Sequence, residues 1–404
     1  MPALPPPSSR VSARWSRLSL IGLGLLAGGC KKATTPPPAP APSVQLAAIA
    51  ATPGEVPFVY VSGYRPEIEI FRLDVDAAKL LPAGQARGGE APSYLAIDRG
   101  ARGARHLFAL DEVDAGKVTA FSIDAATGAL TRLNDASSGG VGPAHLSVDA
   151  TGRWLLVANY ADKQPGTIAI LPIGAEGRLG AAVDSHDFGP GSMPHFITTD
   201  PSNRYVLVPC KGGPYVAVQR FDPENGRLEP ADPDRVAAAP GAGPRHLAFH
   251  PNRRFAYVIN EQALTITTYE WNPQKGQLTE IDTVPTVPST VTDRKGFSTT
   301  EIHVHPSGKW LYASNRGHNS LVQFQIDADS GKLSLVGHEQ RNVNKPRDFD
   351  LDPGGRILLV ANQDGASVSL YRIDAATGRL SPAGEPVPAG LKPSFVGVVL
   401  LAGH

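Results

Sequence analysis

One short segment returns about every fifty residues along this chain, and its period constrains the fold more than any other feature. The copies begin at Ala91, Gly142, Met193, Gly243, Thr299 and Lys345, at steps of 51, 51, 50, 56 and 46 residues. Most copies open around a proline, run into an apolar stretch such as LLVANY and end in a hairpin such as TGAL or EGRL. A fixed period of this length is typical of repeat architectures, in which neighbouring units bury one another's apolar faces.

Each repeat contains four short strand patterns. In the copy that starts at Gly142 they cover 145–149, 153–160, 167–173 and the residues after Leu179, with turn residues between them. No segment of useful length has helical periodicity. Four short antiparallel strands per unit predict a propeller blade in an all-β protein.

The two ends of the repeat region are incomplete in complementary ways. Residues 58–80 open with the second strand of a blade, and residues 392–400 form a lone first strand. Together they would make one further blade, closed by the N- and C-terminal strands, which leaves the ring without a free edge. We therefore predict a seven-bladed β-propeller over residues 57–404.

The residues before the repeats predict export. Residues 1–29 combine three arginines with an apolar stretch, Leu18–Gly29, that is too short to span a bilayer. They are typical of a bacterial lipoprotein signal peptide in which Cys30 becomes the lipidated first residue. Residues 30–56 form a Pro/Ala-rich linker. We expect a periplasmic, lipid-anchored protein of the cell envelope, with Cys210 as a packed thiol.

Charge excludes one class of partner. The chain has 38 basic and 38 acidic residues, and without residues 1–29 the balance is 35 to 38. This distribution gives no electrostatic footprint for nucleic acid. We expect a monomer that binds a small molecule and contacts the membrane only through its anchor.

The repeat register predicts which side chains meet at one end of the propeller. The first strand of a blade is innermost, so its start and the end of the antiparallel second strand lie together near the axis. The first of these positions holds Ser93, Ala144, His195, Arg245, Thr300, Arg347 and Ser394. The second holds Tyr64, Glu112, Tyr160, Lys211, Glu261, Arg316 and Gln363. We call this end of the axis the mouth.

These positions vary in charge, whereas the position before them is repetitive: Asn159, Asn260, Asn315 and Asn362. The asparagines are expected to bond loop backbone. The variable positions gather several cations around Glu261, which suits a small anionic ligand with a reacting carbonyl. The candidate catalytic residues are His195, Arg245, Glu261 and Arg316, and the candidate substrate-binding residues are Lys211, Arg347, His145 and Gln363.

A metal site and a cofactor are not expected. His303 and His305 share a strand face, and His246 and His250 occupy the same register one blade earlier. However, His250 and His305 precede prolines in turns, where a side chain that stabilises the turn is the favoured interpretation. No phosphate-binding loop, dinucleotide fingerprint or Gly-x-Ser-x-Gly motif is present.

Two motifs carry a family resemblance. GPRHLAFHP with AYVINE, and EIHVHPSGKWLYASNRGHNS, resemble the seven-bladed propeller lactonases, which include 6-phosphogluconolactonases and carboxy-muconate cyclising enzymes. The resemblance covers residues 57–404 and implies lactone hydrolysis. It also implies that His195, Arg245, Glu261 and Arg316 form the site. One segment departs from the family: residues 210–214 read CKGGP, where many members have two aspartates, and this puts the substrate in question.

The resemblance implies a mechanism with open alternatives. Arg245 and Arg316 would bind a carboxylate or phosphate and stabilise the oxyanion, while Glu261 and His195 would share the roles of general base and acid. The residues do not decide which of the two is the base. A non-catalytic, tethered propeller that binds a sugar acid or a protein, and a muconate-type cycloisomerase, are the alternative functions.

Overall fold

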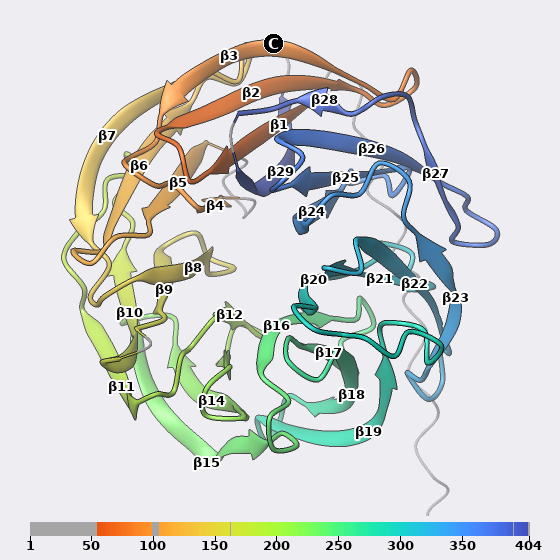
Figure 1. Ribbon diagram of the computed structural model, residues 1–404. Helices are drawn as coiled ribbons and strands as arrows, with labels where there is room; N and C mark the ends of the chain where they lie inside the picture. The colour runs from red at the N-terminus through yellow and green to blue at the C-terminus, as the bar shows by residue number, and fades with distance from the viewer. Residues whose placement is uncertain (1–54, 99–104, 162, 391, 403–404) are drawn as a thin grey trace, which may run out of the picture. The chain divides into compact units, whose positions relative to one another are not determined.

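The computed structural model describes residues 55–98, 105–161, 163–390 and 392–402, so the expected signal peptide and nearly all of the linker lie outside the described residues. Seven antiparallel sheets surround a central axis (Figure 1). This confirms the predicted seven-bladed all-β propeller. In the described part of the chain, no helix is long and apolar enough to cross a membrane.

The blades follow the chain in order, and their strands run outward from the axis. Blade 1 consists of β4 (Tyr94–Ile97), β5 (His106–Asp111), β6 (Lys117–Ile123) and β7 (Leu130–Ser137). Blade 2 consists of β8 (Pro143–Val148), β9 (Trp154–Asn159), β10 (Pro165–Pro172) and β11 (Asp184–Pro190). Blade 3 consists of β12 (Thr198–Thr199), β13 (Tyr205–Cys210), β14 (Tyr215–Asp222) and β15 (Arg227–Ala237).

The remaining blades repeat this order with two modifications. Blade 4 consists of β16 (Pro244–Phe249), β17 (Phe255–Asn260), β18 (Thr265–Asn272) and β19 (Gln277–Pro285). Blade 5 consists of β20 (Ser298–Val304), β21 (Trp310–Arg316), β22 (Ser320–Ile326) and β23 (Leu333–Glu339). Blade 6 consists of β24 (Pro346–Leu351), β25 (Ile357–Asn362), β26 (Ser367–Ile373) and a fourth strand split into β27 (Leu380–Pro382) and β28 (Val387–Pro388). Blade 7 consists of β29 (Pro393–Ala402), β1 (Glu55–Gly63), β2 (Glu67–Asp74) and β3 (Lys79–Arg87).

Blade 7 joins the two ends of the repeat region, as the sequence predicts. β29 is its innermost strand and pairs antiparallel with β1 from Glu55–Ala402 to Gly63–Pro393. The two strands lie side by side although they are more than three hundred residues apart (Figure 1). Backbone hydrogen bonds between strands therefore close the ring.

The apolar core is divided among the blade interfaces. Each of its seven clusters combines side chains from two neighbouring blades. The cluster between blades 2 and 3, for example, packs Leu156 and Ile168 against Val206 and Ala217. Because no cluster belongs to one blade alone, each blade buries its apolar faces only when both neighbours are in place.

The hairpin glycine of one blade packs on the ring that begins the second strand of the previous blade. A Cβ built on Gly226 would lie 2.6 Å from the Trp154 ring, and one on Gly276 would lie 2.2 Å from the Tyr205 ring. The same contact joins Gly128 to Phe58, Gly177 to His106, Gly331 to Phe255 and Gly378 to Trp310. All six glycines also have positive φ angles between 66° and 78°. The repeated glycine is therefore required both by the turn and by the ring beneath it.

This double requirement can be tested at one interface. Gly226→Ala should lower the free energy of unfolding by about 1–3 kcal/mol more than Gly241→Ala, because only the first places a methyl group against a packed ring. Gly241 is the matched control, since its φ is 72° and no other group lies within 4 Å of the position that a Cβ would take there. Equal destabilisation in denaturant titrations would show that backbone strain alone explains the glycine.

Candidate active site

A repeated bulge directs side chains from the first strands into the mouth. The pairing register shifts between Pro244 and His246, so that Arg245 has no partner residue on β17. Equivalent shifts occur at Ala144 and Arg347. The residue before the proline has a positive φ in five copies: Gly142, Met193, Gly243, Lys345 and Lys392. A bulge re-aims the extra residue, and here it turns that residue away from the sheet toward the axis.

A second repeated contact holds the end of the second strand beside this bulge. The backbone N–H of Glu261 donates to the Gly243 carbonyl at 2.7 Å, and that of Lys211 donates to the Met193 carbonyl at 2.9 Å. The same bond ties Glu112 to Ala91, Tyr160 to Gly142 and Gln363 to Lys345. Glu261 is thereby fixed next to Arg245 within blade 4.

The expected role of the repeated asparagines is confirmed in three of four blades. The side-chain amides of Asn159, Asn315 and Asn362 donate to the carbonyls of Ser138, Thr286 and Asn342 in the preceding loops. Asn260 differs, because its amide donates to the hydroxyls of Thr265 and Thr267. These bonds hold the loops that carry the variable mouth residues.

Glu261 is the centre of the site. Its Oε1 lies 2.8 Å from Lys211 Nζ and 3.2 Å from Arg316 Nη2, and its Oε2 lies 3.1 Å from Arg245 Nε. Blades 3, 4 and 5 thus each contribute one cation to one carboxylate. Although burial alone would raise the pKa of Glu261, the attraction of Arg245, Lys211 and Arg316 holds that pKa below its usual value.

Arg245 is buried, and Arg316 is largely buried with a side chain that is 15% exposed. Arg245 is 3% exposed, and its Nη1 donates to the Thr300 carbonyl in blade 5. Arg316 donates through Nε to Ser298 Oγ at 2.9 Å. Burial, with repulsion from Arg245, lowers the pKa of Arg316 to about 10. Both guanidinium groups remain charged at neutral pH and present a positive field to the mouth.

His195 is a neutral imidazole in this cationic setting. It is 9% exposed, and its ring lies 5.4 Å from the rings of both Tyr160 and His246. Neither ring nitrogen has a hydrogen-bond partner among the described residues, and Nδ1 is fully buried. Burial lowers the pKa of His195 well below 6.5, and Arg245 and other nearby cations add to this effect. A neutral imidazole can accept a proton from a bound water molecule.

Arg347, on β24 of blade 6, adds a further cation near the mouth. Its guanidinium carbon lies 5.3 Å from the centre of the Tyr64 ring. Burial raises the pKa of Tyr64 to about 12, although Arg347 opposes this shift. Tyr64 therefore stays protonated and offers a hydroxyl group beside Arg347.

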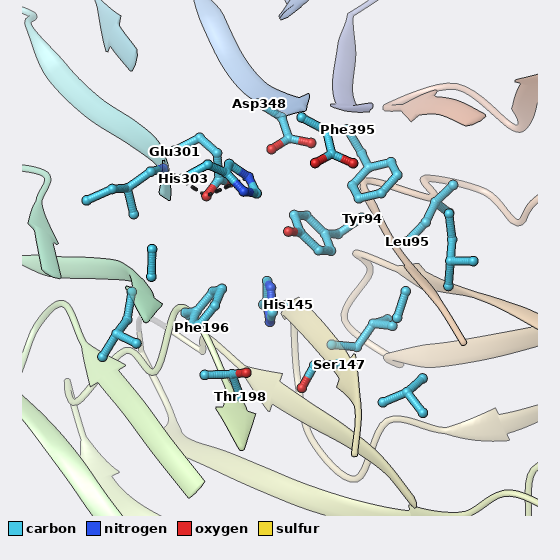
Figure 2. Close-up of a pocket in the computed structure, with 18 of the residues that line it drawn as sticks. Tyr94, Leu95, His145, Ser147, Phe196, Thr198, Glu301, His303, Asp348 and Phe395 are labelled. Atoms are coloured by element: carbon cyan, nitrogen blue, oxygen red, sulfur yellow. Dashed lines mark hydrogen bonds and ion pairs between the residues drawn. The ribbon is translucent and has the colours of Figure 1, made fainter. Parts of the chain in front are cut away.

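Two expected substrate-binding residues, His145 and Gln363, make no hydrogen bond or ion pair with Glu261 within the described residues. The His145 ring stacks between Tyr94 and Phe196, at centroid distances of 4.4 and 4.1 Å, and lines a cavity deeper along the axis (Figure 2). The reason is strand alternation, since His145 follows the mouth residue Ala144 by one position. Gln363 is buried and makes no side-chain hydrogen bond within the described residues.

The expectations for Cys210, His250 and His305 are confirmed, whereas that for Cys30 is untested. Cys210 is buried and burial raises the pKa of its thiol to about 12, as expected for a packed thiol. His250 and His305 donate through Nε2 to the carbonyls of Gly308 and Gly355 at 2.8 Å, which confirms their turn-stabilising role. Cys30 lies outside the described residues, so lipidation stays a prediction.

Sequence reasoning missed three contacts in the mouth. Tyr64 and Tyr160 appeared in the register of mouth positions, but their packing on Arg347 and His195 was not inferred. Ser298, which bonds Arg316, precedes the repeat segment of blade 5 and gave no signal. The direction in which each side chain reaches could not be derived from register alone.

Comparison with known proteins shows the family of the chain. The family described as "Lactonase, 7-bladed beta-propeller" matches residues 58–397. The chain is 32% identical over 301 residues to the 6-phosphogluconolactonase of Bacillus subtilis (strain 168), covering 72% of this chain and 83% of that protein. It is 34% identical over 248 residues to the 6-phosphogluconolactonase of Pectobacterium carotovorum subsp. carotovorum (strain PC1), covering 61% and 71%. The chain belongs to the seven-bladed β-propeller lactonase family.

Solved structures show the same likeness. The periplasmic gluconolactonase PpgL of Pseudomonas aeruginosa superposes with a TM-score of 0.79 at 28% identity, covering 86% of this chain and 99% of that one. The family and the fold are thus established by sequence and by structure. The activity of the chain is a separate question, which depends on the mouth.

Proposed function

We propose that this protein hydrolyses the ring of an anionic lactone at the mouth. The observation that carries the proposal is the pairing of Glu261 with three cations beside a neutral His195. Membership of a lactonase family and similarity to 6-phosphogluconolactonases support the reaction class. The four cations Lys211, Arg245, Arg316 and Arg347 support a substrate that carries a carboxylate or phosphate group.

In this proposal His195 is the general base. Both carboxylate oxygens of Glu261 contact cations, so neither is free to take a proton from water. The His195 nitrogens have no partner among the described residues, so one of them can take a proton from water. Glu261 then serves to hold Arg245, Arg316 and Lys211 in position.

The reaction has two steps. Water oxygen attacks the lactone carbonyl carbon, its proton passes to His195, and the carbonyl oxygen becomes an oxyanion stabilised by Arg245 and Arg316. The bond between that carbon and the ring oxygen then breaks, and His195 returns the proton to the ring oxygen as it leaves. The product is an open-chain hydroxy acid. Muconate-type cyclisation would use the same groups, with a carboxylate of the substrate as the nucleophile that adds to a carbon–carbon double bond.

A hydrolysis screen tests the activity. Proton release in weak buffer would be followed over a neutral sugar lactone, a phosphorylated sugar lactone, an aldaric acid lactone and an aromatic lactone. We expect acceleration above the spontaneous rate with an anionic lactone, and a kcat at least about 10²-fold lower for Glu261→Gln. Glu229→Gln, an exposed residue on the outer strand β15, is the matched control. A wild-type rate equal to the blank on every lactone would favour the non-catalytic binding function.

The pH profile tests the assignment of His195. A base must be deprotonated, and the His195 pKa lies well below 6.5, so kcat/KM should stay level through pH 6.5 and fall only at lower pH. Lys211 is one of the cations that lower this pKa, so Lys211→Met should move the acid limb to higher pH. An acid limb at or above pH 6.5 in the wild type, or an unmoved limb in the variant, would contradict the assignment.

We also propose that the protein works in the cell envelope. The support is the lipoprotein-type pattern of residues 1–30, together with the likeness to a periplasmic gluconolactonase. Fractionation of cells that express the full chain should place the wild type with membranes, whereas Cys30→Ala should appear in the soluble fraction. Identical fractionation of the two proteins would refute the lipid anchor.

A further inference from the structure

The residues that follow the mouth positions form a layer across the axis. Each of these residues directly follows a mouth residue on its first strand and lies one layer deeper along the axis. This axial layer consists of Tyr94, His145, Phe196, His246, Glu301, Asp348 and Phe395. Five of its members are rings in continuous contact, with centroid distances of 4.1 to 4.8 Å from Phe395 through Tyr94, His145 and Phe196 to His246. The two acids come from the adjacent blades 5 and 6.

A cavity of about 730 Å³ lies on the far side of this layer from the mouth. It is lined by the later residues of the first strands, among them Asp149, Thr198 and Asp350, and by none of the mouth residues around Glu261. Figure 2 shows its polar wall at Glu301, His303 and Asp348. The cavity is therefore distinct from the candidate active site.

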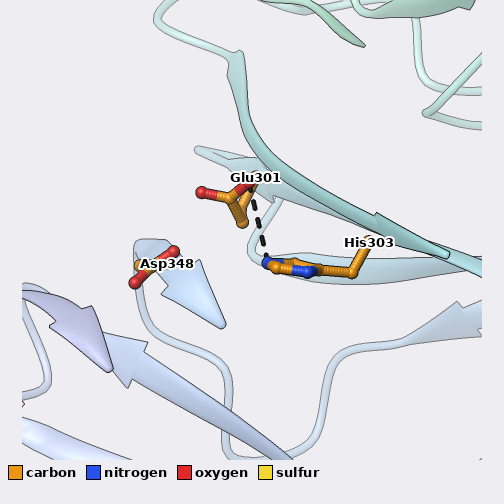
Figure 3. A group of neighbouring side chains, drawn as sticks. All are labelled: Glu301, His303 and Asp348. Carbon is orange, nitrogen blue, oxygen red and sulfur yellow. Dashed lines mark ion pairs between the residues drawn. The ribbon is translucent and has the colours of Figure 1, made fainter. Parts of the chain in front are cut away.

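Two carboxylates and one imidazole converge on that wall. Glu301 and His303 are two residues apart on β20 and share its inward face, and Asp348 projects from β24 next to them (Figure 3). His303 Nε2 lies 3.8 Å from Glu301 Oε1. One ligand atom from each of the three residues lies within 4.8 Å of the other two. Carboxylate oxygen and imidazole nitrogen together are typical ligands of divalent first-row metals.

The charge at this wall is not balanced by a strong cation. Glu301 pairs with His246 Nδ1 at 2.8 Å and accepts the Ile302 N–H, and Asp348 accepts the Val396 N–H at 2.9 Å. Among the described residues no lysine or arginine forms an ion pair with either acid. Two buried carboxyl groups in contact need either a shared proton or a bound cation.

Two further polar groups face the same cavity without a protein partner. His145 is 3% exposed, and its Nδ1 accepts the Ile197 N–H at 3.3 Å, so the proton of the neutral ring is on Nε2. That N–H has no acceptor among the described residues, although the ring lines the cavity. The Tyr94 hydroxyl points into the same space toward the wall and has no hydrogen bond within the described residues (Figure 2). Both groups are hydrogen-bond donors that face the open cavity, and a species bound there can accept from them.

We propose that Glu301, His303 and Asp348 bind a divalent transition-metal ion, of the Zn²⁺ or Mn²⁺ kind, in the axial channel. Bonds of about 2.1 Å place two ligands of one ion at most about 4.2 Å apart. The 3.8 Å between His303 and Glu301 meets this limit, and one carboxylate oxygen of Asp348 lies within 4.8 Å of both. Three protein ligands leave positions open toward the cavity. A water molecule or anion on the metal would accept the hydrogen bonds of Tyr94 and His145.

The proposed site departs from the sequence-based expectation of no metal. That expectation weighed His303 together with His305, but His305 is used in a turn contact with Gly355. The metal-binding partner of His303 is instead Asp348 in the next blade, 45 residues further along the chain. The proposal does not depend on lactone hydrolysis, because none of its ligands belongs to the group around Glu261.

Metal titration of the full-length protein tests the site. After treatment with a chelator, ZnCl₂ and MnCl₂ would be titrated separately by calorimetry, and bound metal would be counted by elemental analysis after dialysis. We expect one equivalent of at least one ion to bind the wild type and raise its Tm. His303→Ala and Asp348→Asn should each weaken metal binding by at least about tenfold. Loss of a residue that only hydrogen-bonds a metal ligand already lowers metal affinity by about that factor.

The variants separate this site from adventitious binding. His303 is one-third exposed in its side chain, so its removal should leave the fold intact, and Tm without metal would confirm this. His186→Ala is the matched control, because His186 lies on the outer strand β11. Loss of affinity in both site variants but not in His186→Ala supports the proposal. No saturable binding by the wild type, or full affinity in both site variants, overturns the proposal. A proton shared between Glu301 and Asp348 would then explain how the two carboxyl groups are held together.

Discussion

The contact between a hairpin glycine and the ring of the previous blade holds the propeller together. It occurs at six interfaces, and it allows neighbouring blades to approach so closely that a Cβ on the glycine would overlap the ring. At the interface of blades 6 and 7, Ala78 occupies the turn at a φ of 51°, and the facing strand begins with Ile357 in place of a ring. The smaller partner leaves room for a methyl group. The exception therefore follows from the same steric rule.

The rigid ring allows irregular backbone near the axis. Each blade is anchored by apolar clusters on both sides, so the start of its first strand can bulge without loss of the sheet. The bulge leaves Arg245 without a partner on the neighbouring strand. The bond from the Glu261 N–H to the Gly243 carbonyl holds the end of the second strand next to Arg245. In blade 3 the first strand is reduced to Thr198–Thr199, and His195 precedes it. Strain and function thus concentrate at the mouth.

Much of the fold follows from periodicity, and much of the site follows from register. The fifty-residue repeat predicts the blades, the closing pair of terminal strands and the meeting of Glu261 with Arg245 and Arg316, all of which the structure contains. Depth along the axis was harder to predict. His145 is one residue past its mouth position, and one residue moves a side chain to another layer. The convergence of Glu301, His303 and Asp348 also depends on contacts between blades, which a pattern within one repeat does not contain.

The same alternation couples the two sides of the axial layer. Arg245 faces the mouth while His246, the next residue, bonds Glu301 on the channel side, and Arg347 is followed in the same way by Asp348. The mouth residues and the residues of the Glu301 wall therefore stand next to one another on the same first strands. The mouth and the channel thus share the short segment of backbone that follows each repeat proline.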